Sequence, residues 1–239
     1  DIMAEDIAPI ILDKIEKTFH SNLKKAGVIQ KEVLEKARSG TMRSINQYSH
    51  KVGKALADAF RSEITSDILP DGTFYYNIAQ KTMVPPLKEA HKMVSDVADE
   101  IQAVNNEKMG IGLKPIRPPI EMDRVDGLID VLTSGLSFED EADYLNEPVK
   151  NLVDHFADHH MEMNAEFMDN TGLAVIVIRT AESTCCEWCG DRAGVYDGYD
   201  EAKDNEAFAR HEGCKCELEI RGGGTSGKMK YAGHAFVRG

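Results

Sequence analysis

The sequence predicts a mainly α-helical protein, a long-helix N-terminal domain that is followed by a small β module. Three observations lead to this prediction. Apolar residues recur every three or four positions over much of the first 170 residues, which is the period of an amphipathic helix. A continuous run of aliphatic and β-branched residues then follows at 173–180. All five cysteines of the chain fall within 185–216, an irregular segment rich in turn residues.

The composition is that of an ordered protein in water. Of the 239 residues, 42% are hydrophobic and 29% are charged, and the net charge is −13. This charge disfavours non-specific binding to DNA phosphates, which requires clustered Lys and Arg. The longest aliphatic run, 173–178, is far shorter than the roughly 20 residues that span a bilayer. With no secretory signal visible, we expect no membrane partner, a cytoplasmic origin and reduced thiols.

The first part of the helical region is predicted to hold three helices. The apolar stripe of the first helix consists of Ile7, Ile11, Ile15, Phe19 and Leu23. We expect Gly27 to end this helix, and a short second helix to stop near Gly40. A third stripe covers 45–64 and is closed by the turn sequence LPDG at 69–72.

The second part of the helical region is interrupted by prolines. We expect a helix to begin after Pro85 and Pro86, because apolar residues at 87–104 alternate by three and four. The sequence GIGLKPIRPP at 110–119 cannot continue a helix and is a candidate linker. Helices are expected again at about 121–133 and 147–169.

Two strands are predicted beyond the helices. LAVIVIRT reads as a buried strand, and CELEIR at 216–221 alternates as a second strand does. The segment after it is rich in glycine and has basic residues, so we expect it to be extended or mobile. The predicted domains are therefore a helical domain at 1–170, a β module at 171–221 and a tail at 222–239.

The cysteine segment has the spacing of a structural zinc site. Cys186 and Cys189 stand three positions apart, and His211 and Cys214 repeat that spacing. Two ligands on each of two tight turns can complete a tetrahedron around one ion. A segment this small has little core, so a zinc ion would supply much of its folding energy. A redox Cys-x-x-Cys is the alternative, but it gives no role to the second cluster.

The site has more candidate ligands than positions. Cys185 is placed outside it, because adjacent residues rarely point to one metal. Cys216 begins the second strand, two residues beyond Cys214, and its side chain can return to the same side. The fourth ligand is therefore either His211 or Cys216, and in the second case His211 would donate to a thiolate from outside the site.

Three other patterns were weighed against plainer interpretations. His160 and Glu162, followed by Cys186-x-x-Cys189, resemble the signature of zinc nucleobase deaminases, although Cys185 stands where that signature has proline. His155 and His159 share one helix face near Asp154 and Asp158, which is more typical of the polar edge of an amphipathic helix than of a metal site.

The third pattern lies in the tail. Gly222, Gly227 and Lys228 match the start of a phosphate-binding loop, but Met229 replaces the Ser or Thr that binds magnesium. No helix is expected after it, so a mobile linker is the favoured interpretation.

The cysteine segment resembles the C-terminal signature of phage head morphogenesis proteins, the Mu F-like minor head family. CCEWCGDRAGVYD is followed here by ARHEGCKCELEI. In the family, a C-x-x-C and a Leu-Ala-Gly-x-Tyr-like stretch precede RH-x-x-C-x-C and a strand. Residues 191–196 stand for that stretch, and Arg210 and His211 match the later motif. The helical region, including LPDGTFYYNIAQK and GIGLKPIRP, is also similar to minor head proteins from phages and prophages of Gram-positive bacteria.

This resemblance implies a minor structural protein of a tailed phage or prophage head. Such a protein is a virion component in few copies, associated with the portal or inner capsid, and acts in head assembly or DNA ejection. It implies portal or capsid proteins as partners, no catalysis and no small-molecule substrate. A zinc-dependent hydrolase of the deaminase type is the alternative.

A third possibility is an adaptor whose zinc module binds nucleic acid. The charge balance disfavours it, because 185–216 contains eight Asp and Glu against four Lys and Arg. The stretch 221–239 has four basic residues and no acidic one, which leaves a weak DNA contact to the tail alone.

Overall fold

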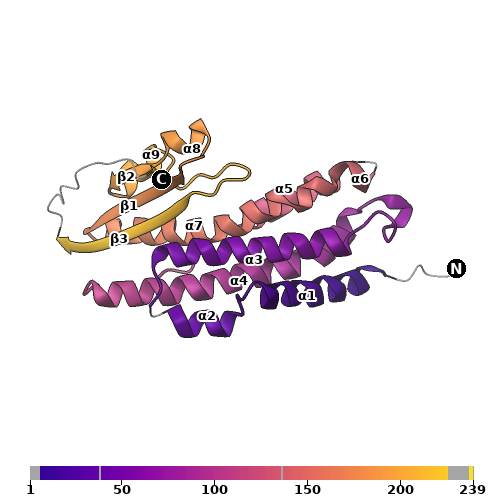
Figure 1. Cartoon of the computed structure of the whole chain (residues 1–239), viewed down its shortest axis with the longest axis horizontal. Helices are drawn as coiled ribbons and strands as arrows, with labels where there is room; N and C mark the ends of the chain where they lie inside the picture. The colour runs from indigo at the N-terminus through magenta and orange to yellow at the C-terminus, as the bar shows by residue number, and fades with distance from the viewer. Residues whose placement is uncertain (1–5, 38, 136, 226–236, 239) are drawn as a thin grey trace. The chain divides into compact units, whose positions relative to one another are not determined.

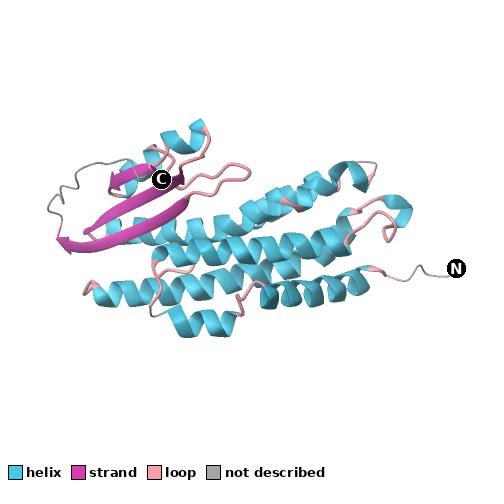
Figure 2. Cartoon of the chain, in the orientation of Figure 1, coloured by secondary structure: helices cyan, strands magenta, loops and turns pink. Residues whose placement is uncertain are grey.

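The computed structural model describes residues 6–37, 39–135, 137–225 and 237–238 (Figure 1). The chain is mainly α-helical and has a small sheet near its C-terminal end (Figure 2), which confirms the predicted fold class. None of the helices in the described residues combines the length and the apolar character that crossing a membrane requires.

The long helices follow the predicted stripes. The described helices are α1 (Ala8–Lys25), α2 (Gln30–Ala37), α3 (Met42–Glu63), α4 (Tyr76–Lys108), α5 (Met122–Leu132), α6 (Phe138–Glu141), α7 (Glu147–Asn170), α8 (Glu187–Asp191) and α9 (Tyr199–Asp204), with short 3-10 helices η1 (Pro70–Gly72) and η2 (Ala142–Leu145). In α1 the buried face contains four of the five predicted stripe residues, from Ile11 to Leu23. Gly27 has a φ of 65°, and this left-handed conformation ends the helix as expected.

The prediction for the start of α4 was wrong. The helix begins nine residues before Pro85 and continues through Pro85 and Pro86. Each proline removes a backbone hydrogen bond, at a cost of about 3 kcal/mol. The buried face also continues through them, with Ile78, Met83 and Leu87, and each such side chain contributes about 1.5–3 kcal/mol. The packing of this face therefore offsets the loss of hydrogen bonds.

The sheet contains both predicted strands and two that were not predicted. Its strands are β1 (Leu173–Glu182), β2 (Gly194–Asp197), β3 (Glu217–Thr225) and β4 (Val237–Arg238). β1 lies between β2 and β3 and is antiparallel to both, and β4 pairs in parallel with the end of β1. Within the tail that was predicted to be extended or mobile, residues 222–225 are extended, since they continue β3 and pair with β1. The rest of that prediction, at 226–236 and 239, lies outside the described residues.

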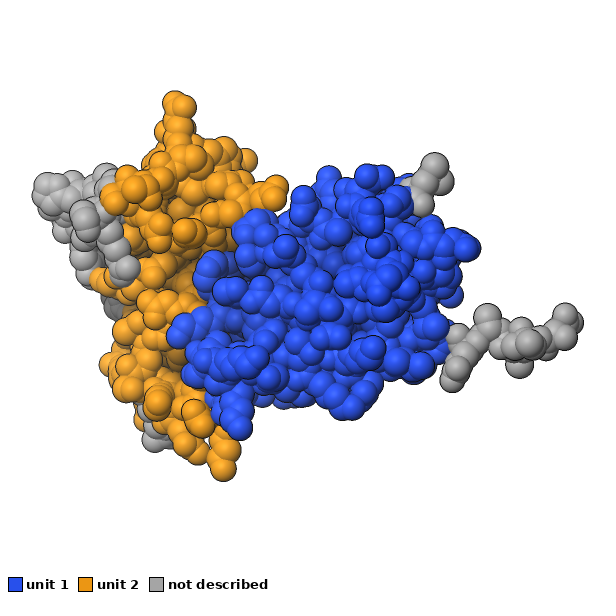
Figure 3. All heavy atoms as spheres, turned by 45° about the vertical axis from the view of Figure 1, so that its right-hand side comes forward, with its two compact units in different colours: residues 1–30, 49–93, 120–154 blue, residues 31–48, 94–119, 155–239 orange. Residues whose placement is uncertain are grey.

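The chain divides into two compact units (Figure 3). Unit 1 comprises 1–30, 49–93 and 120–154, and unit 2 comprises 31–48, 94–119 and 155–239. The helices α3, α4 and α7 contribute residues to both. Unit 2 thus combines the β module with helical segments, and the predicted boundaries along the chain stay a prediction.

The candidate linker is a loop, as expected, and its backbone is bound to α7 within unit 2. Residues 111–121 contain neither helix nor strand. The side chain of Asn164 accepts a hydrogen bond from the amide of Ile116 at 2.9 Å and donates one to its carbonyl at 2.8 Å. Arg117 forms ion pairs with Asp96 and Asp99 of α4. The proline-rich segment is therefore held in place by side chains of two helices.

Helices α3 and α7 approach closely at Gly53 within unit 1. A Cβ atom at Gly53 would lie 3.2 Å from the Cα atom of Lys150 and 3.2 Å from the Cβ atom of Val153. Neither atom belongs to the flexible end of a side chain, so the helices themselves would have to move. The glycine is thus required by backbone packing rather than by a turn.

We predict that Gly53→Ala lowers the free energy of unfolding by about 1–3 kcal/mol, as overpacked cores do, although alanine is favoured in a helix by about 1 kcal/mol. The matched control is Gly127→Ala in α5, where a Cβ atom meets nothing within 4 Å. This control should raise stability by about 0.5–1 kcal/mol. Urea unfolding of both variants checks the prediction, and equal stabilisation by both would contradict it.

Candidate metal centre

Two loops of unit 2 carry the sequence-predicted ligands. In the first loop, Cys186 has an extended backbone and caps the start of α8, and Cys189 lies within that helix. In the second loop, the amide of Cys214 donates a hydrogen bond to the carbonyl of His211 at 3.1 Å. Gly213, with a φ of 71°, permits this tight turn. Each pair of ligands therefore sits on one turn of the backbone.

The ligand atoms of the two loops face one another. The Nε2 atom of His211 lies 3.3 Å from the Sγ atom of Cys186 and 2.9 Å from that of Cys189. The Sγ atoms of Cys189 and Cys214 are 3.7 Å apart. A zinc ion bound tetrahedrally at about 2.0–2.3 Å separates neighbouring ligand atoms by about 3.5–3.8 Å. The sulfur–sulfur distance fits this value, and the sulfur–nitrogen distances are somewhat shorter.

All five predicted ligands belong to the cluster. In two groups the ligand atoms lie within 4.8 Å of one another; these are Cys186, Cys189 and His211, and Cys189, Cys214 and Cys216. Cys189 belongs to both groups. Cys185 lines the same cavity, of about 240 Å³, but is in neither group among the described residues. The structure therefore brings together a Cys and His cluster that can bind a metal ion.

Hydrogen bonds, burial and nearby charges shift the pKa values of the buried thiols in the cluster. A hydrogen bond with Cys216, together with the charges of Arg210 and Arg179, lowers the pKa of Cys214 to about 4 although burial opposes this. The same hydrogen bond, and burial, raise the pKa of Cys216. Burial raises the pKa of Cys189 to about 11. One thiolate thus lies beside two thiols, and a metal ion would displace the remaining protons.

Arg210 fixes the second ligand loop to α7. Its guanidinium pairs with both carboxylate oxygens of Asp158, with 3.0 Å between Nη2 and Oδ1. Nη1 donates to the carbonyl of Cys214 and Nη2 to that of Cys216, both at 3.2 Å. Both charged side chains are buried, at 8% and 1% exposure. This ion pair therefore holds the second ligand loop in position, and Asp158 balances the charge that Arg210 brings to it.

Arg179, on β1, contacts the cluster through Cys214. Its Nη1 atom donates to the carbonyls of Ala207 at 2.8 Å and Ala209 at 2.5 Å. Its Nη2 atom is 3.5 Å from the Sγ atom of Cys214. The sequence analysis did not single out this residue. Its signal was present, since Arg179 is the only charged residue in the stretch LAVIVIRT at 173–180.

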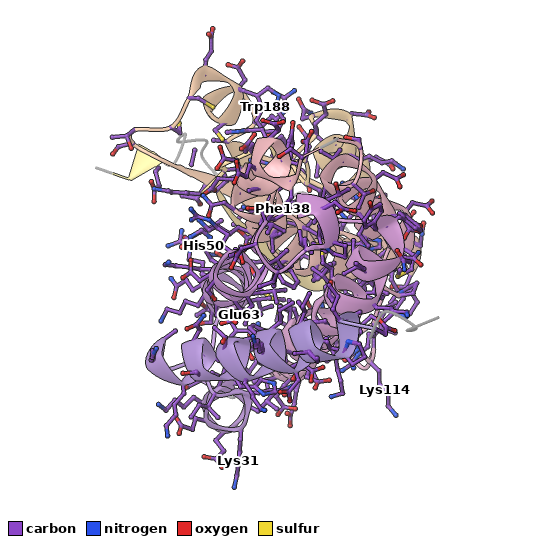
Figure 4. The ribbon with its side chains drawn as sticks, turned by 90° about the vertical axis from the view of Figure 1, so that its right-hand side faces the viewer. Lys31, His50, Glu63, Lys114, Phe138 and Trp188 are labelled. Carbon is purple, nitrogen blue, oxygen red and sulfur yellow. The ribbon has the colours of Figure 1, made fainter. Side chains whose placement is uncertain are left out.

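Trp188, the one tryptophan of the chain, lies beside the cluster on α8 (Figure 4). The guanidinium of Arg192 stacks over its ring at 3.9 Å, and that of Arg179 lies 5.4 Å from the ring centre. The imidazole of His211 meets it edge-on at 5.0 Å. Arg192 also pairs with Glu206. The indole thus shields one side of the cluster and is a natural optical probe of it.

The two histidines that share a face of α7 lie against each other. The rings of His155 and His159 stack with their centres 5.6 Å apart. Asp158 is paired with Arg210, as described above. Within unit 1, Asp154 accepts a hydrogen bond from Ser49 at 2.8 Å. Both carboxylates that suggested a metal site on this helix therefore serve other partners.

The histidine of the deaminase-like pattern lies elsewhere. His160 is fully buried, and its Nε2 atom is 2.7 Å from a carboxylate oxygen of Asp99. Its Nδ1 atom is 3.4 Å from the amide nitrogen of Asn164. Glu162 lies near Tyr199, whose pKa is raised by burial and then by that carboxylate. Among the described residues, the histidine grouped with the cysteines is His211 and not His160.

The phosphate-loop pattern falls partly outside the described residues. Gly222 belongs to β3, and a Cβ atom there would lie 3.1 Å from the sulfur of Met168. Gly227 and Lys228 lie beyond the described part of the chain.

Comparison with protein-family models, curated proteins and solved structures found no match to this chain. The case for a function therefore rests on the residues and their geometry.

Proposed function

We propose that this chain is a minor structural protein of a tailed phage or prophage head, associated with the portal or inner capsid, whose unit 2 is closed by one structural zinc ion. The observation that supports this most is the convergence of the two motifs. The C-x-x-C and RH-x-x-C-x-C stretches that resemble the minor head family form one cluster, and Arg210 of the second motif binds Asp158. The motif thus contains both the ligands and the residue that fixes them to a helix.

The ligand set supports zinc in a structural role. Thiolates and imidazole are the ligands that zinc prefers in proteins, and four of them complete a closed tetrahedral site. The cluster contains five candidate ligand side chains, one more than such a site needs. A catalytic zinc keeps one position for water. A site that its own side chains can fill is better suited to stabilising the fold than to hydrolysis.

The surface of unit 1 supports a role in protein contacts. Three tyrosines at the start of α4 and in η2, Tyr75, Tyr76 and Tyr144, are more than 40% exposed. The rings of Phe74 and Phe138, which adjoin these segments, are 5.4 Å apart. The stretches 64–76 and 125–147 also contain nine Asp and Glu and no Lys, Arg or His. Exposed tyrosines are typical of protein interfaces, so this acidic, aromatic surface suits a portal or capsid partner.

The proposal predicts that the chain is found in phage particles. Particles should be purified from an induced lysogen of the strain that encodes the chain, and both proheads and filled heads should be analysed by quantitative mass spectrometry. We expect the chain in both, in far fewer copies than the major capsid protein. Its absence from proheads and heads alike would overturn the proposal.

The metal is tested separately on the purified chain. Elemental analysis after purification without chelator should give about one zinc per molecule, as four-ligand structural sites do. Well under half an equivalent would count against the zinc site, whatever the particle analysis shows.

A further inference from the structure

Arg179 places a positive charge in the interior of unit 2, and no carboxylate of the described residues forms an ion pair with it. The residue is 1% exposed, and its described hydrogen bonds go to two backbone carbonyls and one sulfur. Among the described residues, its Nε atom has no hydrogen-bond partner. Arginine cannot lose its proton in a protein. A buried charge of this kind is strongly unfavourable unless an anion lies nearby.

The other buried arginine of the site shows the contrast. Arg210 has its own counter-ion, since Asp158 binds it through both oxygens. Among the hydrogen-bond partners of Arg179 in the described residues, the one that can carry a negative charge is the sulfur of Cys214, at 3.5 Å from Nη2. The carbonyls of Ala207 and Ala209 are dipoles, and the ring of Trp188 offers only the weaker attraction of its face. The thiolates of the cluster are therefore the remaining source of balancing charge.

The charge of a zinc site depends on how many thiolates bind the ion. Two thiolates neutralise Zn²⁺, three leave a net charge of −1, and four leave −2. We infer that Arg179 is the internal counter-ion of the metal centre, and that this centre holds zinc through at least three thiolates. The inference rests on the proposed zinc site. It accommodates both Cys216 and His211 as fourth ligand, and it disfavours a neutral site of two thiolates, one histidine and a water.

The charge of Arg179 should affect how tightly the centre binds zinc. A buried cation beside the sulfur atoms stabilises a zinc centre that carries a net negative charge. Removing this cation should destabilise the zinc-bound centre. Zinc should then be bound less tightly at neutral pH and be released at a higher pH.

The experiment compares Arg179→Met, Arg179→Lys and Arg192→Met with the unaltered chain. Arg192 also lies against Trp188 but has Glu206 as its partner, which makes it the matched control. Zinc affinity is measured by chelator competition, and the pH of half-release by a colorimetric zinc indicator. We expect Arg179→Met to weaken zinc binding by about tenfold or more, because the negatively charged centre loses its buried counter-ion, and therefore to move half-release to higher pH. Arg179→Lys keeps the charge and should lose less affinity than Arg179→Met, and Arg192→Met should bind zinc nearly as tightly as the unaltered chain.

The number of bound sulfur atoms is measured independently, by X-ray absorption on the unaltered chain with zinc. Three or four sulfur ligands support the inference, and two overturn it. Equal losses of affinity in Arg179→Met and Arg179→Lys would show that shape rather than charge matters, which also overturns it. If Arg179→Met does not fold, the sulfur count and the affinity of Arg179→Lys decide.

The failure of this inference is distinct from failure of the zinc site. If the unaltered chain binds no zinc, the proposed site is wrong and Arg179 has no metal to balance. If it binds zinc through three sulfur atoms and Arg179→Met binds equally tightly, only the counter-ion role is wrong.

Discussion

Replacement of Cys189 by serine should abolish zinc binding. Cys189 is the residue shared by both ligand groups, and its sulfur contacts both His211 and Cys214. Without it, neither group retains three ligands, and serine is a poor ligand for zinc at neutral pH. A structural zinc ion contributes about 10–16 kcal/mol to folding in small zinc domains. We therefore expect the zinc content to fall from about one equivalent to less than about a tenth, and the β module to lose its order.

Elemental analysis measures the metal, and the fluorescence of Trp188 reports on the surrounding structure. The matched control is Cys185→Ser, which removes the neighbouring thiol that lines the same cavity. This control should keep its zinc and the emission of the unaltered chain. Loss of zinc in Cys185→Ser with retention in Cys186→Ser would show that the ligand assignment is wrong by one residue.

The second large effect is expected at the buried ion pair. Asp158→Asn keeps the shape of the side chain but removes the carboxylate charge that pairs with the buried Arg210. Breaking one partner of a buried pair costs about 3–5 kcal/mol. The loss should appear in urea unfolding of the zinc-bound chain as a lower midpoint. The hydrogen bonds from Arg210 to Cys214 and Cys216 should loosen with it.

The control for this prediction is an exposed ion pair. Lys17 and Asp13 are one turn apart on α1, and their side chains are 74% and 60% exposed. Asp13→Asn should change stability by less than about 1 kcal/mol, because such pairs are screened by water. Similar losses for Asp158→Asn and Asp13→Asn would mean that burial does not strengthen the Arg210 pair.

The helices could be predicted from the sequence where a single apolar stripe continues without interruption. This is why α1, α3 and α7 agree with the periodicity. The start of α4 could not be predicted. The helix-breaking effect of a proline is visible in the local sequence, whereas the tertiary packing that offsets it is not. The strand β2 was missed because it has only four residues, of which Gly194 and Asp197 are typical of turns.

The ligands of the candidate site were predictable and their supports were not. Zinc-like spacing is a local property, so Cys186, Cys189 and Cys214 can be found by counting along the chain. Arg210 reaches Asp158 across 52 residues, and no local pattern records such a pairing. The supports are set by how β1 and α7 fold around the loop, which only the tertiary structure specifies.

The interleaving of the two units has a consequence for how the protein is made. Each unit is assembled from three separate stretches of chain. During synthesis, unit 1 lacks its last stretch until residue 154 has emerged from the ribosome, and unit 2 lacks its ligand loops until still later. The first segment of unit 2 ends at residue 48, and the next segment of that unit begins only at residue 94. Isolating either unit as a fragment would require cuts within α3, α4 and α7, so point substitutions are the better way to separate what each unit does.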